Sequence, residues 1–275
     1  MMDVLKLGGE LLDDAGAIRH IAGAIVRAAS AGPLVVVHGG GRAIDAELRA
    51  RGAEPRFVDG LRVTDSAALD AVVSVLAGRN NTALVAAIGA MGGRAVGLTG
   101  ADAFIGRSTR AGVFSAVSGE QVDLGLVGQL EGVDVALLRD LAALGYIPVV
   151  ASIGVTATGE LLNVNADTLA GHLAAALRAS RLTIAGATAG VLDAQGATIE
   201  RLTAEEMDGM IASGAAHSGM IAKLAACRRA LDAGVAEIAI VSGRGVMDFA
   251  AASGTRLRQG SGEPGPPSSY VGRAF

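Results

Sequence analysis

Short runs of aliphatic and β-branched residues alternate along the chain with alanine-rich stretches in which apolar positions recur every three or four residues. The first pattern is typical of buried strands and the second of amphipathic helices. Strands are therefore predicted at Val4–Leu7, Leu34–Val37, Ala95–Leu98, Ile147–Ala151, Leu182–Ala185 and Glu237–Val241. Helices are predicted around Ile18–Ile25 and at Ala43–Arg51, Ser66–Leu76, Thr82–Met91, Val135–Leu144, Ala166–Leu177, Ala204–Ala212 and Ile221–Ala233.

This alternation predicts an α/β fold, with an open, mainly parallel central sheet and helices on both faces. Between Ala101 and Leu130 the glycines, serines and aspartates are spaced as in β-hairpins, so an antiparallel excursion over the sheet edge is expected. A boundary after Ile153–Thr156 would divide the chain into an N-terminal lobe, residues 1–156, and a C-terminal lobe, residues 157–259. The proline-rich tail, residues 260–275, has little to bury and is expected to be flexible.

Composition narrows the classes of function. The chain has 275 residues, 51% of them hydrophobic, which is enough for a full core. Its net charge of −4 is mild and its 23 basic residues are scattered, so nucleic acid is not an expected partner. A single cysteine, Cys227, fits the reducing cytoplasm. The apolar run 133–150 is interrupted by charges, and neither a membrane span nor a signal peptide is predicted.

Two predicted strands end in glycines. The first continues as Lys6-Leu7-Gly8-Gly9-Glu10, where backbone N–H groups and a lysine could meet an anion, although a strand end with a solvated lysine would look the same. The second continues as His38-Gly39-Gly40-Gly41 into a helix, an arrangement that can cradle a phosphate or carboxylate. His38 is either a base or, more simply, a structural histidine. Neither a dinucleotide-binding fingerprint nor a P-loop is present.

Three further segments combine polar residues with helix starts. Arg62, in Gly-Leu-Arg-Val-Thr, could bind a carboxylate bidentately or lie on the surface. Asn163 and Asp167, in Asn-Val-Asn-Ala-Asp, could orient a ligand and a lysine, while the Asn between them could simply cap a helix. Lys223, in Gly-Met-Ile-Ala-Lys, is predicted in the first turn of a helix, where it opposes the helix dipole unless an anion is near.

With these segments in this order, the chain resembles the amino acid kinase family from Val4 to about Thr255. Arg62 in its context, the stretch Asp123–Gly128 and the Asn163 segment favour the acyl amino acid branch over the UMP kinases, which share a Lys-x-x-Gly-Glu opening. The resemblance implies ATP-dependent phosphorylation of the side-chain carboxylate of N-acetyl-L-glutamate, in arginine biosynthesis. Another acceptor, such as an acetylaminoadipate derivative or a nucleoside monophosphate, and a catalytically silent metabolite-binding regulator remain alternatives.

The resemblance also implies roles for individual residues. Lys6 and Lys223 would stabilise the transferring phosphoryl group and Asp167 would orient both lysines. Gly40, Gly41, Arg62 and Asn163 would bind the acceptor. Gly8 and Gly9 would face the phosphates of ATP, and the nucleotide-binding turn would include Ala187, Thr188, Gly190 and Leu192. Mg²⁺ would be held by the nucleotide and water, so no protein metal ligand is expected.

Two positions depart from the family pattern. Ala187 stands where its members commonly carry Asp, and Thr82 where a lysine is usual. The chain also begins almost at its first strand, without the N-terminal helix that links arginine-sensitive members into hexamers. A cytoplasmic homodimer without arginine feedback is therefore expected.

Overall fold

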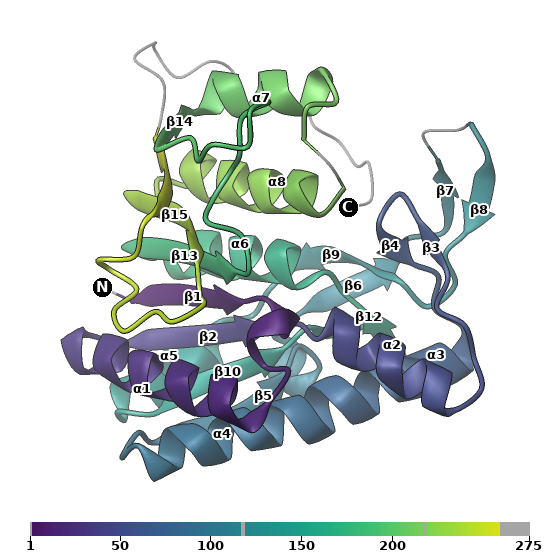
Figure 1. Ribbon diagram of the computed structural model, residues 1–275. Helices are drawn as coiled ribbons and strands as arrows, with labels where there is room; N and C mark the ends of the chain where they lie inside the picture. The colour runs from purple at the N-terminus through teal and green to yellow at the C-terminus, as the bar shows by residue number, and fades with distance from the viewer. Residues whose placement is uncertain (1, 117–118, 217, 259–275) are drawn as a thin grey trace.

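The computed structural model describes residues 2–116, 119–216 and 218–258 (Figure 1). The tail predicted to be flexible lies outside these residues. A single eight-stranded sheet forms the centre of the molecule, in the order β14-β16-β15-β13-β1-β2-β10-β5. Its strands are β1 (Asp3–Leu7), β2 (Leu34–His38), β5 (Ala95–Thr99), β10 (Ile147–Ala151), β13 (Arg181–Gly186), β14 (Arg201–Thr203), β15 (Glu237–Ser242) and β16 (Gly254–Arg258).

Most neighbours in this sheet are parallel, as predicted. The exception is the antiparallel pair β15 and β16, and β14 runs parallel to β16. Strands from residues 1–156 occupy one half of the sheet and strands from residues 157–259 the other, with β1 paired to β13 at the junction. The two predicted lobes would therefore meet at β1, the strand that carries Lys6.

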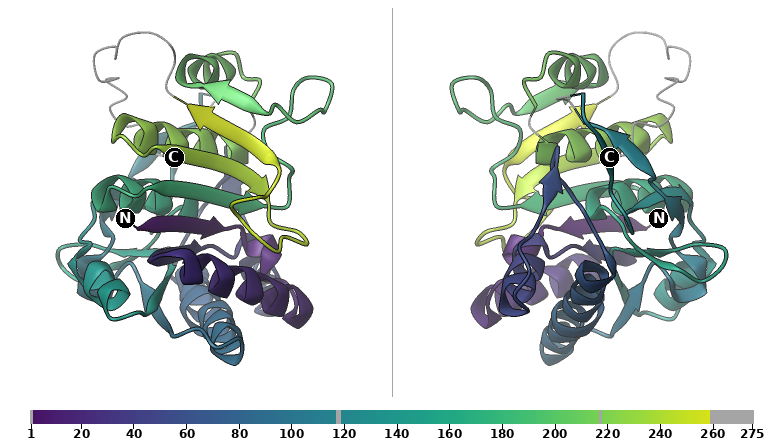
Figure 2. Two further views of the ribbon diagram at one scale, coloured as in Figure 1. Left: turned by 90° about the vertical axis from the view of Figure 1, so that its left-hand side faces the viewer. Right: turned by 90° about the vertical axis from the view of Figure 1, so that its right-hand side faces the viewer.

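Helices cover both faces of the sheet (Figure 2). On one face the core contains Leu5 and Leu7 of β1, packed with residues of α1 (Ala15–Ala31) and α4 (Asn81–Ala90). On the other face it contains Val4, packed with residues of α5 (Ala136–Ala143), α6 (Ala166–Leu177), α7 (Ala204–Ala212) and α8 (Ser218–Asp232). The two-residue period of a strand thus places even positions of β1 against α6 and odd positions against α1.

The two helices predicted at Ser66–Leu76 and Thr82–Met91 are in fact one. The segment Ser66–Ala90 is a continuous helix of α3 (Ser66–Val73), a π-helical segment η2 (Ser74–Asn80) and α4. Gly78 and the two asparagines weaken the helical pattern locally, but without a proline the chain continues and absorbs the irregularity as a π-turn. This helix is long and apolar enough to span a membrane by length and composition alone, but 44% of its most apolar window is buried in the fold.

The predicted antiparallel excursion is present. β6 (Arg107–Arg110) pairs with β9 (Gly128–Gly132), and β7 (Val113–Ser115) pairs with β8 (Gln121–Asp123). β11 (Ile153–Val155) and β12 (Leu161–Asn163) join β6 and β9 in a four-stranded sheet. The hairpins β7–β8 and β3–β4 (Phe57–Val58 and Leu61–Arg62) project from the end of the molecule toward which β1 and β2 point (Figure 1). The remaining elements are α2 (Gly41–Ala50) and the 3₁₀ turns η1 (Gly9–Leu11) and η3 (Asp102–Phe104).

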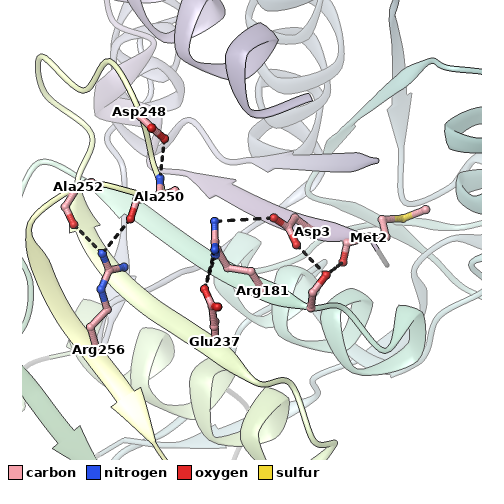
Figure 3. A network of polar contacts seen from close by, with 9 residues as sticks. Met2, Asp3, Arg181, Glu237, Asp248, Ala250, Ala252 and Arg256 are labelled. Atoms are coloured by element: carbon pink, nitrogen blue, oxygen red, sulfur yellow. Dashed lines mark hydrogen bonds and ion pairs between the residues drawn. The ribbon is translucent and has the colours of Figure 1, made fainter. Parts of the chain in front are cut away.

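The opposite end of the strands is tied by charged side chains (Figure 3). Arg181, the first residue of β13, lies 2.6 Å from Glu237 Oε2 at the start of β15 and 4.0 Å from Asp3 Oδ2 at the start of β1. The ion pairs of Arg181 are surface pairs, which contribute at most about 1 kcal/mol each. They lie at the amino end of the parallel strands, while the glycines gather at the carboxyl end. Figure 3 also shows Arg256, which donates from Nη2 to the carbonyls of Ala250 and Ala252 and so secures the loop that follows the carboxyl end of β15.

Candidate active site

Lys6 lies on the face of β1 that packs against α6, because it has the same parity as Val4. Its Nζ is 2.8 Å from Oδ1 of Asp167, in the first turn of α6. Both residues are buried, with 5% and 6% of their surface exposed. Gly8 follows β1 and Gly40 follows β2, as the sequence predicted, and these two parallel strands are neighbours in the sheet. Because parallel strands bring their carboxyl ends to one edge of the sheet, the two glycine segments lie together.

Asp167 is held in place by the start of its own helix. The side chain of Asn165 caps α6 by accepting the N–H groups of Asp167 and Thr168, at 2.8 and 3.1 Å. The capping interpretation of this asparagine is therefore correct. Asp167 presents its second oxygen, Oδ2, to Lys223 Nζ at 3.7 Å. One buried carboxylate thus joins two lysines that are 217 positions apart in the sequence.

The predicted position of Lys223 within its helix was wrong. The helix α8 begins at Ser218 rather than Ile221, so Lys223 lies in its second turn, where Nζ donates to the carbonyl of Gly219 at 3.1 Å. The helix dipole acts mainly on the first turn, so it gives no reason to expect an anion beside a lysine in the second turn. The ion pair with Asp167 gives a firmer reason to place this lysine in the site.

The approach of α6 to α8 depends on a glycine that the sequence analysis did not single out. A Cβ atom on Gly171, one turn after Asp167, would lie 2.8 Å from the carbonyl oxygen and 2.9 Å from the Cα of Ala226 on α8. Real Cβ atoms essentially never come so close to backbone. Gly171 therefore sets the spacing of the two helices that carry Asp167 and Lys223.

The two glycine loops touch. A Cβ on Gly9 would collide with the Cα of Gly40, and a Cβ on Gly40 would lie 2.7 Å from Nδ2 of Asn80. Gly40 precedes α2, and no side chain caps the helix there. The first N–H groups of α2 are thus available to an anion. Asn80 is buried, and its Nδ2 has no hydrogen-bond partner among the described residues.

Arg62 is buried beside Gly41. Its Nη2 donates to the carbonyl of Gly41 at 3.1 Å, and its Nη1 is 2.5 Å from Oδ1 of Asp45 on α2. The guanidinium also lies over the ring of Phe57, 4.6 Å from its centroid. Only 8% of Arg62 is exposed, so the surface interpretation is wrong. Asp45 is a partner that sequence reasoning missed, because a lone aspartate in a helical pattern carries no signal of its own.

Asn163 joins the same group through a threonine. Its Nδ2 donates to Oγ1 of Thr64 at 3.1 Å, and that hydroxyl donates to the carbonyl of Arg62 at 2.9 Å. The four residues predicted to bind the acceptor, Gly40, Gly41, Arg62 and Asn163, are therefore connected in space.

The predicted nucleotide turn follows β13. Ala187 lies next to the first glycine loop, because its N–H donates to Oε1 of Glu10 at 2.9 Å. Thr188 is exposed, and Leu192 is 43% exposed and bridges to Thr198. Gly190 has a φ of 140°, which favours glycine, and a Cβ there would lie 2.7 Å from Oγ1 of Thr255. The turn is thus pinned at both ends, by Glu10 and by β16.

His38 is a structural histidine. It is fully buried, its Nδ1 is 3.1 Å from the carbonyl of Gly39, and its Nε2 is 3.2 Å from Nδ2 of Asn81. Burial lowers the pKa of its imidazole to about 4. A neutral ring that donates through Nδ1 and accepts through Nε2 satisfies both contacts.

The donor set fits a divalent cation that is bound chiefly through a nucleotide. In the part of the chain that the structure describes, no three His, Cys, Asp or Glu side chains gather as they would around a protein-bound metal. Two lysines and several backbone N–H groups face the same edge of the sheet instead. Mg²⁺ keeps much of its water and often binds through phosphates, so this site suits it.

An open α/β sheet that presents glycine loops and paired lysines at its carboxyl edge defines a phosphate-handling protein of the α/β class. The chain belongs to the amino acid kinase family, whose model matches residues 1–242. An acetylglutamate kinase of Symbiobacterium thermophilum is 44% identical over 213 residues, which cover 76% of this chain and 73% of the relative. Another, from Methanopyrus kandleri, is 39% identical over 90% of this chain and 97% of its own length.

The fold is likewise shared with solved structures. The protein smu.665 of Streptococcus mutans UA159 superposes with a TM-score of 0.78 at 25% identity, over 94% of this chain and 98% of that one.

Proposed function

We propose that this protein is an acetylglutamate kinase, which transfers the γ-phosphoryl group of ATP to the side-chain carboxylate of N-acetyl-L-glutamate in arginine biosynthesis. The observation that carries the proposal is the buried Asp167 carboxylate between Lys6 and Lys223, at the edge where the glycine loops meet. The relatives named acetylglutamate kinase, at about 40% identity over most of the chain, support the choice of acceptor. The product would be N-acetyl-L-glutamyl 5-phosphate.

The reaction asks for positioning and charge neutralisation rather than for a base. A carboxylate acceptor is already ionised at neutral pH, so no proton has to be removed from it. The N–H groups of Gly40 and Gly41 would hold this carboxylate, and those of Gly8 and Gly9 would face the phosphates. Gly9 contacts Gly40, so the two reactants would meet directly at this point. Neutral His38 has no proton-transfer role in this scheme.

The two lysines would act on the charge of the transferring group. Asp167 orients both ammonium groups. Each ammonium group could therefore interact with phosphoryl oxygens through its other N–H bonds without having to reorganise. When bound, Mg²⁺ would add charge neutralisation at the phosphates. Arg62 would grip the α-carboxylate of the acceptor through its planar fork, and Asn163 would bind beside it. In the free protein Asp45 holds this guanidinium in place.

The proposal includes the organisation of the molecule. Residues 1–156 would bind the acceptor and residues 157–259 the nucleotide, in the cytoplasm where both substrates occur. A homodimer would form along β5, whose outer edge has no partner among the described strands, and along the helix Ser66–Ala90 beside it. Met91, just beyond that helix, is 44% exposed and would be covered.

A coupled ADP-release assay tests this function. We expect ADP release that depends on N-acetyl-L-glutamate, with N-acetyl-L-α-aminoadipate and UMP much poorer. Release with UMP alone would identify another branch of the family, and a preference for the aminoadipate derivative would change the acceptor. No release with any of them would favour a silent regulator. Lys223→Ala serves as the matched inactive control.

A further inference from the structure

The side chain of Glu10 joins the two loops expected to face ATP. Its Oε1 accepts the Ala187 N–H at 2.9 Å. Its carboxylate lies flat over Gly8, where a Cβ would be 2.5 Å from each of its oxygens, and a Cβ on Gly186 would be 3.2 Å from Oε1. The absence of side chains at Gly8 and Gly186 thus leaves room for this carboxylate.

Within the described part of the chain, the second oxygen of this carboxylate, Oε2, forms neither a hydrogen bond nor an ion pair, and Lys6 and Lys223 are both directed to Asp167. An anion is therefore held among the N–H groups that would receive phosphates. With metal-free ATP, two negative groups would face each other, which is unfavourable. With a hydrated divalent cation between them, the same carboxylate would attract the nucleotide.

We propose that Glu10 contacts the hydrated Mg²⁺ of the bound nucleotide through Oε2, and so makes this site select Mg·ATP over metal-free ATP. The proposal rests on the proposed function, since it takes the loops of Gly8 and Ala187 to be the ATP site. Mg²⁺ commonly combines phosphate and water ligands with one carboxylate, directly or through its water. Glu10 is a specificity-determining residue in this scheme, and the transferring group is left to the lysines.

The test compares the binding of two forms of ATP by isothermal titration, without acceptor and thus without turnover. Wild-type protein and Glu10→Gln are titrated with ATP in excess Mg²⁺ and with ATP in excess EDTA. Gln keeps an oxygen for the Ala187 N–H and removes only the charge. Glu205→Gln, an equal charge change at an exposed position on α7, is the matched control.

Removal of the Glu10 charge should have effects of opposite sign on the binding of the two forms of ATP. In Glu10→Gln the Kd for Mg·ATP should rise about tenfold, as for the loss of one charge-assisted contact, while the Kd for metal-free ATP should fall. Glu205→Gln should change neither. Equal changes of both Kd values would mean that Glu10 only positions the loops, and unchanged values would mean that it does not face the nucleotide; either result overturns the inference. If the wild-type protein binds neither form of ATP, the proposed function fails as well.

Discussion

Asp167 and its two lysines form a buried group whose charges depend on one another. The side chains of Lys6 and Asp167 are 6% and 8% exposed, and that of Lys223 is 19% exposed. Lys6→Ala and Lys223→Ala should each lower kcat about 10²–10³-fold, with much smaller effects on substrate binding. The reason is that the two lysines would stabilise the charge of the transition state more than that of the bound substrates. Steady-state kinetics with thermal melts as a folding check measure this.

The role of Asp167 is best tested with a substitution that preserves the shape of the side chain. Asp167→Ala leaves a buried lysine unpaired, which can cost about 3–5 kcal/mol of stability. Asp167→Asn keeps the shape and part of the hydrogen bonding, and should still lose most of kcat because the ammonium groups lose their orientation. Lys223→Ala with near wild-type kcat would contradict the mechanism, since an exposed helical lysine would behave in that way.

Arg62 offers a separate test at the acceptor end. Lys cannot reproduce a fork that meets Asp45 through Nη1 and the Gly41 carbonyl through Nη2. Arg62→Lys should therefore raise the KM for the acceptor about tenfold or more while the KM for ATP changes little. Equal rises in both constants would show that Arg62 does not bind the acceptor. Arg42→Lys, at an exposed position in the first turn of α2, is the control.

Burial of His38 links stability to pH. The pKa of its imidazole is lowered from 6.5 to about 4, so the unfolded state binds a proton in this range and the folded state does not. Stability is therefore complete above pH 6.5 and is lost as the pH falls toward about 4. The difference corresponds to about 3 kcal/mol. Burial lowers the pKa of His172 to about 4 as well, so it adds to the same loss.

Urea denaturation across this window measures the linkage. His38→Gln should remove about 3 kcal/mol of the acid-induced loss, because no group titrates at that position in either state. His20→Gln, the same substitution at an exposed position, is the matched control. An unchanged profile in His38→Gln would mean that folding does not lower the pKa of His38.

At the scale of elements, the spacing between α6 and α8 determines whether the lysines can share Asp167. Gly171→Val should push α8 away from α6, since its Cβ would already lie 2.9 Å from the Ala226 Cα. Overpacking of this kind costs about 1–3 kcal/mol. It should lower kcat as well, because Lys223 on α8 moves away from Asp167 on α6. Chemical denaturation and steady-state kinetics report the two effects.

Gly209 on α7 provides the matched control. A Cβ there would meet nothing within 4 Å. Gly209→Ala should therefore stabilise the protein by about 0.5–1 kcal/mol, the usual gain for alanine over glycine in a helix, and leave kcat unchanged. If Gly171→Val were as harmless as this control, the helix spacing would not matter for catalysis.

At the scale of the whole molecule, we expect two copies of the chain to associate along the outer edge of the sheet. The sheet ends in β5, whose outer edge has no partner among the described strands, beside the small exposed residues Thr82, Ala86 and Ala90 of α4. Unpaired edges commonly associate. We expect a dimer in size-exclusion chromatography with light scattering, and a monomer for Ala86→Arg. Ala143→Arg, equally exposed but on α5, should remain dimeric. A dimer that survives Ala86→Arg would place the interface elsewhere.

The sequence alone predicted the strands of the parallel sheet and most of its helices, because two-residue and three-to-four-residue periods are local consequences of burial. The glycine segments after β1 and β2 could also be predicted locally, because glycines that directly follow a buried strand indicate where backbone groups are accessible. The edge strands β14 and β16 were not predicted, because short strands at the rim of a sheet carry few buried positions to reveal a period.

Some features of the candidate site could be predicted from the sequence, and others were decided only by the tertiary structure. The sequence determined which residue types were available, and that Lys6 and Gly40 would lie at the carboxyl ends of predicted strands. The contact between Asp167 and Lys223 was expected only from the family resemblance, because the residue pattern does not show that α6 and α8 pack closely at Gly171. Nor could it determine the partners Asp45 and Glu10, whose carboxylates meet Arg62 and Ala187 only after distant segments have come together. The hydrophobic periodicity of a helix or strand involves residues that are close in the sequence, so it can be read from the sequence. The pairing of charged side chains depends on distances between residues far apart in the sequence, which only the packed structure defines.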